Sequence, residues 1–241
     1  MPDAREGIRH AYASGDLEQA DRLARTHLRQ HDDDGRTWEW AGLIHFALGR
    51  FPEAVSALER ASVCVPLTGE GRIALAQGYG FLGKRDLACE LLALLISDEF
   101  LTAALLLQVA RALNHLEEPV LAMHACRSAT RRDPELAQAY YDMGFYGSRC
   151  GVQPHHIEAL ARKAVSLAPD HTRYRIGLAS HLVLQGRMQE AYCAIRNLSD
   201  HQIDSVTCEC CLVRIAAIYE KAGDTSRLER CRLNLGQTTT D

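Results

Sequence analysis

Three cysteines, Cys208, Cys210 and Cys211, form the densest group of candidate metal ligands in the sequence, and His201 precedes them. Thiolates and imidazoles bind zinc, and a structural zinc site needs four such ligands, commonly from paired CxxC or CxxC…H motifs. If this segment is helical, Cys208 and Cys211 share a face while Cys210 points elsewhere. The spacing is therefore poor for a metal, and we expect none. A metal- or redox-dependent protein that uses these three thiols stays open as an alternative.

The other candidate metal ligands, a pair of histidines and a run of aspartates, lie near predicted helix starts, and their spacing does not favour metal binding. His155 and His156 follow Pro154, and adjacent side chains on a helix point to different sides, which disfavours chelation of one ion. The acidic run Asp32–Asp34 precedes Gly35; carboxylates favour the start of a helix, whereas calcium needs more oxygens at defined spacing. GxGxxG, P-loop, GxSxG and HExxH motifs are absent from the sequence. We expect no catalytic residue, no cofactor, and a protein that is not an enzyme.

Composition and charge narrow the class of partner. Of the 241 residues, 47% are hydrophobic and 24% are charged, which suits a folded protein with a continuous apolar core. The formal net charge is -4, whereas nucleic-acid binders show a basic excess or stripe, so we expect no nucleic-acid partner. Met1–Tyr12 holds no apolar block of signal-peptide length, and Phe100–Ala110 is too short to cross a bilayer. We therefore expect a cytoplasmic protein without membrane insertion.

A period of 34 residues organises the chain. Glycines and alanines recur at this interval, in phase with one another, at Gly15, Gly49 and Gly83 and at Ala20, Ala54, Ala88 and Ala122. The segment Gln185–Ala191 repeats the same local phrase. In each phrase a glycine ends one helix, and a new helix starts about three residues later. The period therefore predicts a series of helical hairpins.

The pattern resembles the tetratricopeptide repeat (TPR) family, whose signature is W-x2-L-G-x2-Y, then A-x3-F, an Ala and a Pro. Residues 35–68 match best, with Trp38, Ala41, Gly42, His45, Gly49, Ala54, Leu58, Ala61 and Pro66 at signature places. The resemblance implies an all-α fold, a right-handed superhelical α-solenoid of about seven TPR-like hairpins. It also implies one domain over 1–241, with repeats at approximately 1–34, 35–68, 69–102, 103–136, 137–171 and 172–205 and a C-terminal cap at 209–236.

Three places depart from the repeat. Glu117 stands where the turn glycine is expected, with Pro119 nearby to force the turn instead. One extra residue enters in Gly151–His156, and three enter near Ser199–Ser205. We expect the curvature of the superhelix to change at these two insertions.

The resemblance further implies a concave groove lined by the first helix of each hairpin. The family's groove positions fall here on Trp40, Leu43, Phe46, Ile73, Gln77, Phe81, Leu107, Gln108, Arg111, His115, Tyr141 and Phe145, together with the acidic Glu39 and Asp142. Contiguous exposed apolar surface usually marks binding, and aromatic and Arg side chains are favoured anchors. We predict a non-catalytic scaffold or adaptor whose groove binds a peptide segment or helix with apolar anchors. Each of these residues could instead be a packing residue in the core, and this alternative applies above all to Trp40.

The resemblance allows two other functions, a dedicated chaperone and a co-chaperone that binds a terminal carboxylate. A dedicated chaperone for a secreted or membrane-destined client would use the same groove and stays open, as does self-association. Co-chaperones of this family hold a terminal carboxylate with a Lys/Asn/Arg clamp. Those positions read Arg5, Arg9, Trp40, Glu70 and Ala74 here. A carboxylate would meet Glu70, so we do not expect this mode.

Overall fold

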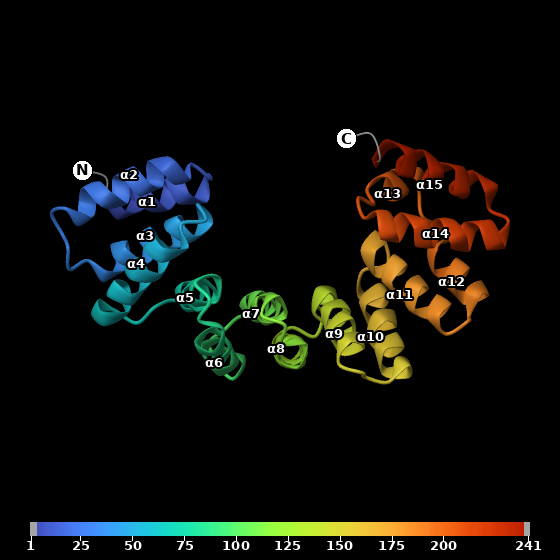
Figure 1. Cartoon of the computed structure of the whole chain (residues 1–241), viewed down its shortest axis with the longest axis horizontal. Coiled ribbons are helices and arrows are strands. Elements are labelled where there is room, and N and C mark those ends of the chain that lie inside the picture. Colours follow the sequence, from blue (N-terminus) through green and yellow to red (C-terminus); the bar gives the residue numbers. More distant parts are fainter. Residues whose placement is uncertain (1–3, 239–241) are drawn as a thin grey trace. The chain divides into compact units, whose positions relative to one another are not determined.

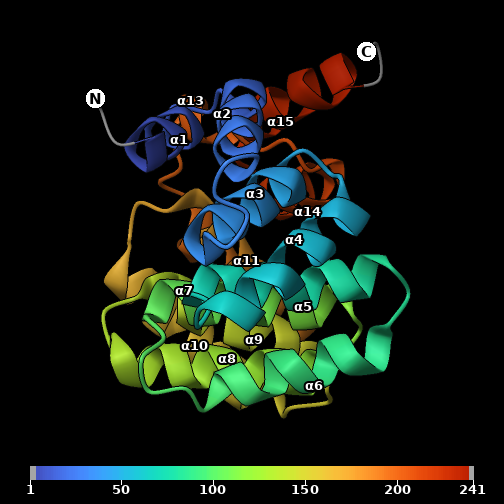
Figure 2. The ribbon, with the colours of Figure 1, turned by 90° about the vertical axis from the view of Figure 1, so that its left-hand side faces the viewer.

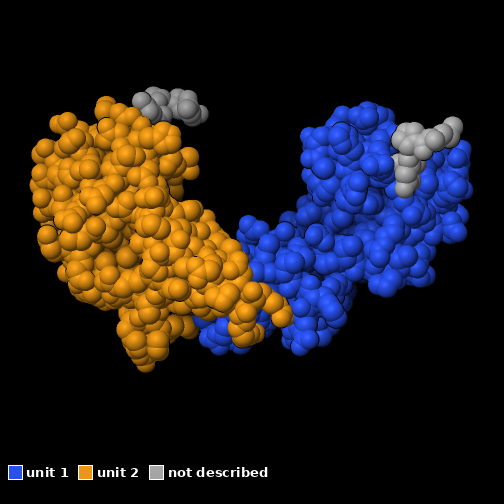
Figure 3. All heavy atoms as spheres, turned by 180° about the vertical axis from the view of Figure 1, so that it is seen from behind, with its two compact units in different colours: residues 1–128 blue, residues 129–241 orange. Residues whose placement is uncertain are grey.

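The computed structural model describes residues 4–238, which form fifteen helices and no strand (Figure 1). By backbone contacts the chain divides into two compact units, residues 1–128 and 129–241 (Figure 3). The first unit holds α1 (Ala4–Ala13), α2 (Leu17–Leu28), α3 (Gly35–Ala47), α4 (Phe51–Cys64), α5 (Gly69–Phe81), α6 (Arg85–Ile96), α7 (Ala103–His115) and most of α8 (Pro119–Arg132). The second holds α9 (Ala137–Arg149), α10 (Pro154–Leu167), α11 (Thr172–Leu184), α12 (Met188–Ile195), α13 (Asp200–Asp204), α14 (Glu209–Ala222) and α15 (Thr225–Thr238).

These helices pair into seven antiparallel hairpins, with the short α13 as an addition, so the predicted all-α fold of about seven hairpins is confirmed for the described residues. Figure 2 shows one such pair, in which α5 and α6 run side by side and are joined by a tight turn. Helix α13 lies in the predicted insertion and starts with a capping box of Ser199 and Gln202. The single-domain organisation and the change in curvature stay predictions, and residues 1–3 and 239–241 of that domain lie outside the described part.

In each hairpin, the turn between the two helices contains one residue with a left-handed backbone conformation. The turn glycines are Gly15, Gly49, Gly83, Gly151, Gly186 and Gly223, with φ between 72° and 82°. Glycine has no Cβ and adopts this region at little cost, which is why it ends these helices. At the remaining turn Glu117 itself takes φ 60°. The turn is therefore made by Glu117 in the glycine's conformation, and Pro119 serves instead as the first residue of α8.

Small residues let the helices approach closely, as the repeat pattern predicts. The recurring alanines Ala20, Ala54, Ala88 and Ala122 are all 0% exposed. A Cβ added to Gly78 would lie 2.6 Å from Cγ2 of Val55, which leaves no room for a side chain. In the second unit the core continues into the last hairpin, where the buried Tyr219 donates a hydrogen bond from its hydroxyl to the carbonyl of Ile195 at 3.0 Å.

The acidic run before the second hairpin caps a helix, as expected. Asp34 is the N-cap of α3 and accepts hydrogen bonds from the backbone and hydroxyl of Thr37. It also contacts Arg5 and His27, each at 2.9 Å. Burial alone would raise the pKa of Asp34, but the hydrogen bonds from Thr37, Arg5 and His27 outweigh burial and hold it at about 2.

Candidate peptide-binding surface

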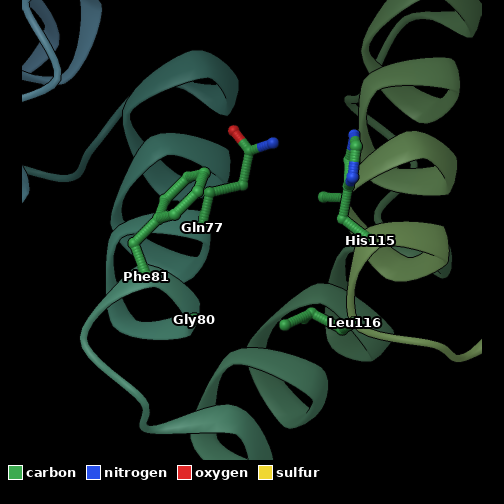
Figure 4. Close-up of a pocket in the computed structure, with 6 residues that line it drawn as sticks. Gln77, Gly80, Phe81, His115 and Leu116 are labelled. Atoms are coloured by element: carbon green, nitrogen blue, oxygen red, sulfur yellow. The ribbon is translucent and has the colours of Figure 1, made fainter.

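A hollow opens between α5 and α7 in the first unit (Figure 4). It has a volume of about 140 Å³ and is lined by Gln77, Gly80, Phe81, Ala112, His115 and Leu116. Gln77 and His115 lie on its two sides, and small residues, Gly80 and Ala112, leave the space open. The sequence placed Gln77, Phe81 and His115 on a binding surface; Gly80, Ala112 and Leu116 were missed. Their small size or position after the helix end gave no binding signal.

Phe81 lines this hollow, and its ring packs against two other aromatic rings. Its side chain is 61% exposed. The ring stacks on Phe51 with centroids 3.9 Å apart and planes 8° apart. Phe46 lies 5.4 Å from Phe51 and 6.1 Å from Phe81. Sequence reasoning found Phe46 and Phe81 but missed Phe51, because it begins the second helix of its hairpin and not the first. The rings restrict Phe81, so a ligand would meet an ordered apolar surface.

The other predicted residues of the first unit differ in exposure. Arg111 and His115 are exposed, while Trp40, Leu43, Phe46, Gln77 and Gln108 are half-buried. Ile73 and Leu107 are buried, at 2% and 8% exposed, which leaves them little area for a ligand. The ring of Trp40 packs edge-on against that of Tyr12, with centroids 5.3 Å apart, and adjoins the core. This contact agrees with the alternative that Trp40 is a packing residue. The binding role of the set stays a prediction.

Glu39 occupies a groove position of the repeat, but its side chain is buried and is not part of this surface. Its carboxylate is buried and accepts hydrogen bonds from the backbone N–H (2.6 Å) and hydroxyl (2.8 Å) of Thr68, the N-cap of α5. Arg36 donates to the same carboxylate at 2.9 Å. Glu39 therefore ties the second hairpin to the third. A buried carboxylate needs such partners, and the neighbouring helix start provides them.

In the second unit the predicted residues are Tyr141 and Phe145. Tyr141 packs on the bare backbone of Gly177, where an added Cβ would lie 2.6 Å from Cε2 of the ring. The guanidinium of Arg173 lies 5.1 Å from its ring centroid, and burial raises the pKa of the Tyr141 hydroxyl. Phe145 is 50% exposed. Asp142, the other groove position predicted here, is buried and accepts a hydrogen bond from Gln138 at 2.6 Å, so it is a packing residue.

The structure corrects the expected geometry of the histidine pair and the cysteines. The rings of His155 and His156 lie 4.0 Å apart, closer than adjacent helix positions suggested. The sulfurs of Cys208 and Cys210 are 2.7 Å apart, and those of all three clustered cysteines lie within 4.8 Å of one another. Cys210 does not point away, because α14 begins only at Glu209. Cys208 is the N-cap, with the extended angles φ −83° and ψ 111°, so it stands outside the helix while its sulfur lies against that of Cys210 in the first turn.

Comparison with known proteins supports the repeat family. A family model described as a tetratricopeptide repeat matches residues 6–66. No curated protein matches the chain. The predicted resemblance to the TPR family is thereby confirmed over this segment, and beyond it the described residues continue as helical hairpins.

Solved structures show the same fold at low sequence identity. The C-terminal part of a TPR repeat-containing protein from Cytophaga hutchinsonii has a TM-score of 0.70 and 10% identity, covering 99% of this chain and 96% of that one. PilF of Pseudomonas aeruginosa has a TM-score of 0.63 and 15% identity, covering 86% and 92%. YrrB, described as a TPR protein with an unusual peptide-binding site, has a TM-score of 0.54 and 18% identity, covering 69% and 86%. Within residues 4–238, no helix has the length and apolar character needed to span a bilayer.

Proposed function

We propose that this protein is a non-catalytic interaction scaffold whose first unit binds a peptide segment through an apolar anchor. The observation that carries the proposal is the exposed, ring-supported Phe81 beside the hollow between α5 and α7. A side chain seated there would contact Phe81 and Leu116 and bury apolar surface, which contributes about 25 cal/mol per Å². Gln77 and His115 could hydrogen-bond the peptide backbone beside it.

The fold supports this proposal over catalysis. Hairpins and their turns account for the described residues, and no separate catalytic domain remains among them. Tetratricopeptide arrays generally act by binding other proteins, and YrrB is described with a peptide-binding site. The geometry favours an aromatic or large aliphatic anchor, because a hollow of about 140 Å³ suits one side chain.

The experiment selects peptides from a random display library on the wild-type protein and measures their affinity by fluorescence anisotropy. Selected peptides are expected to share an aromatic or large aliphatic residue. Phe81→Glu places a charge in the lining of the hollow and should weaken binding at least about tenfold, the equivalent of 1.4 kcal/mol.

Phe100→Glu is the matched control, because Phe100 is the same residue type in the same unit and is 94% exposed, away from the lining of the hollow. It should leave peptide affinity unchanged, with circular dichroism confirming the fold of both variants. Equal loss in both variants, or no loss in either, would place binding elsewhere.

The dedicated chaperone remains a second use of the same surface. An adaptor binds the tail of a folded partner, whereas a chaperone keeps a client soluble that aggregates alone. Co-production of a captured partner with wild type and with Phe81→Glu separates them, since only a chaperone's client would become insoluble with the variant. We place either activity in the cytoplasm, which cell fractionation tests.

A further inference from the structure

The thiols of Cys208, Cys210 and Cys211 gather at the start of α14 in the second unit. Cys208 and Cys210 are exposed, whereas free cysteine is among the most buried residue types. Elsewhere in the chain Cys126 and Cys231 are 0% exposed, whereas Cys64 and Cys193 are exposed as well, so the grouping of three thiols sets this site apart more than exposure does. Core packing therefore does not account for the exposed pair.

The sulfur positions fit a single metal ion. Metal–sulfur bonds are about 2.3 Å long, so three thiolates around one ion stand about 4 Å apart. Here the three sulfurs lie within 4.8 Å of one another. The closest pair, Cys208 and Cys210 at 2.7 Å, must move apart by roughly 1.3 Å to reach this spacing, which rotation of their exposed side chains allows.

The supporting structure is rigid and accessible. The backbone N–H groups of Cys211 and Leu212 donate to the carbonyl of Cys208, which fixes the first turn of the helix. The buried residues Leu212, Ile215 and Tyr219 anchor α14 in the core. Cys210 also lines an open hollow of about 470 Å³, through which an ion can enter.

We propose that Cys208, Cys210 and Cys211 bind one soft, thiophilic metal ion in three-coordinate form, with Cu(I) as the ion of best fit. Thiolates select soft ions such as Cu(I) and zinc. A structural zinc site takes four protein ligands, and among the described residues this group offers three. Cu(I) is satisfied by three thiolates, so the cluster suits it without a further ligand.

The test titrates Cu(I) into the reduced full-length protein without oxygen, in competition with a chromophoric Cu(I) chelator. One tightly held equivalent is expected, together with sulfur-to-copper charge-transfer absorption. Cys210→Ser, at an exposed position, should weaken Cu(I) binding at least about tenfold, as loss of a direct ligand exceeds the effect of a supporting residue.

Cys193→Ser is the matched control, since Cys193 is an exposed thiol on α12 of the same unit. It should leave Cu(I) affinity unchanged, as should Phe81→Glu in the first unit, because the metal site does not depend on peptide binding. Circular dichroism confirms that each variant folds.

Three results would overturn the proposal. The first is equal Cu(I) affinity of wild type and the variant lacking all three thiols. The second is preferential retention of Zn²⁺ over Cu(I), which would reject the choice of ion. The third is a disulfide between Cys208 and Cys210 that already exists in the purified protein and resists reductant, detected by mass spectrometry, because its sulfurs would then be unable to bind the ion.

Discussion

The two units differ in what lies beside the small residues of neighbouring first helices. Between α5 and α7, Gly80 and Ala112 leave a hollow beside the exposed Phe81. Between α9 and α11, Gly177 forms a socket that the ring of Tyr141 fills. A small residue in a repeat thus gives either a binding hollow or a tight contact, depending on the side chain that the neighbouring helix presents.

The units also differ in how their first helices begin. In the first unit Asp34, Thr68 and Thr102 each cap a first helix through a side-chain hydrogen bond to the backbone. In the second unit the N-caps of α9, α11 and α14 are Leu136, His171 and Cys208, and they make no such bond. Each side-chain cap contributes about 1 kcal/mol, so the second unit relies more on packing.

The largest expected effect comes from removing the charged cap of α3. The pKa of Asp34 in the folded protein is about 2, below the ordinary value of about 3.9 in an unfolded chain. The carboxylate therefore stabilises the fold above about pH 4, and this contribution is lost as the pH falls toward 2. We expect Asp34→Asn to lower the free energy of unfolding by about 2 kcal/mol at pH 7 and by much less near pH 2. Urea unfolding at both pH values measures this, and a difference independent of pH would contradict it.

A pair of glycine substitutions tests the contrast between socket and hollow. In Gly177→Ala the new methyl would strike the Tyr141 ring at 2.6 Å. Overpacking costs about 1–3 kcal/mol, partly offset by the better helix propensity of Ala, so we expect a net loss of about 1 kcal/mol. In Gly80→Ala the nearest atom is a terminal methyl of Leu116 at 3.0 Å, which can move into the hollow.

Gly80→Ala is therefore expected to be neutral or to stabilise by up to about 1 kcal/mol. Thermal unfolding of both variants supplies the comparison. Adding Tyr141→Leu to Gly177→Ala should restore part of the loss, because the ring is what the methyl strikes. Equal effects of the two alanine substitutions would remove the distinction between the units.

A third substitution gives the second unit a cap that it lacks. Leu136 stands three periods after Asp34, and both N-caps have φ −74° and ψ 87°. An aspartate at 136 can therefore accept a hydrogen bond as Asp34 does. We expect Leu136→Asp to stabilise the protein by about 0.5–1 kcal/mol relative to Leu136→Ala, the variant that removes the side chain without adding a cap. Urea unfolding of the two variants decides; no difference would mean that no cap forms.

The smallest expected effect concerns the turn between α7 and α8. Glu117 adopts φ 60°, a conformation that costs most residues roughly 1 kcal/mol and costs glycine little. Glu117→Gly is expected to stabilise by about 0.5 kcal/mol, since the added freedom of the unfolded chain offsets part of the gain. Gly83→Ala, at the equivalent turn with φ 79°, provides the opposite change and should destabilise. Thermal unfolding that moves in the same direction for both would refute the account.

The fold could be predicted from residues close together in the sequence. The binding surface could be predicted only in part, because it also depends on contacts between different hairpins. The left-handed turns could be predicted, because a glycine at a helix end adopts positive φ without help from a distant residue. Phe81 and His115 were readable from repeat positions, since a helix fixes the direction of its side chains. Glu39 was misplaced because its partner, Thr68, lies 29 residues away. Phe51 was missed because it begins a second helix, and only the packed hairpins bring its ring onto Phe81.

The sequence by itself determined the all-helical hairpins, their turns and the buried alanines, because hydrophobic periodicity and glycine punctuation act within one hairpin. Only the tertiary structure decided where a hollow stays open and where a ring fills it. It also decided that the thiols of Cys208 and Cys210 meet, since this depends on α14 beginning at Glu209. Both outcomes depend on side-chain directions after packing, and a one-residue change in a helix start redirects them.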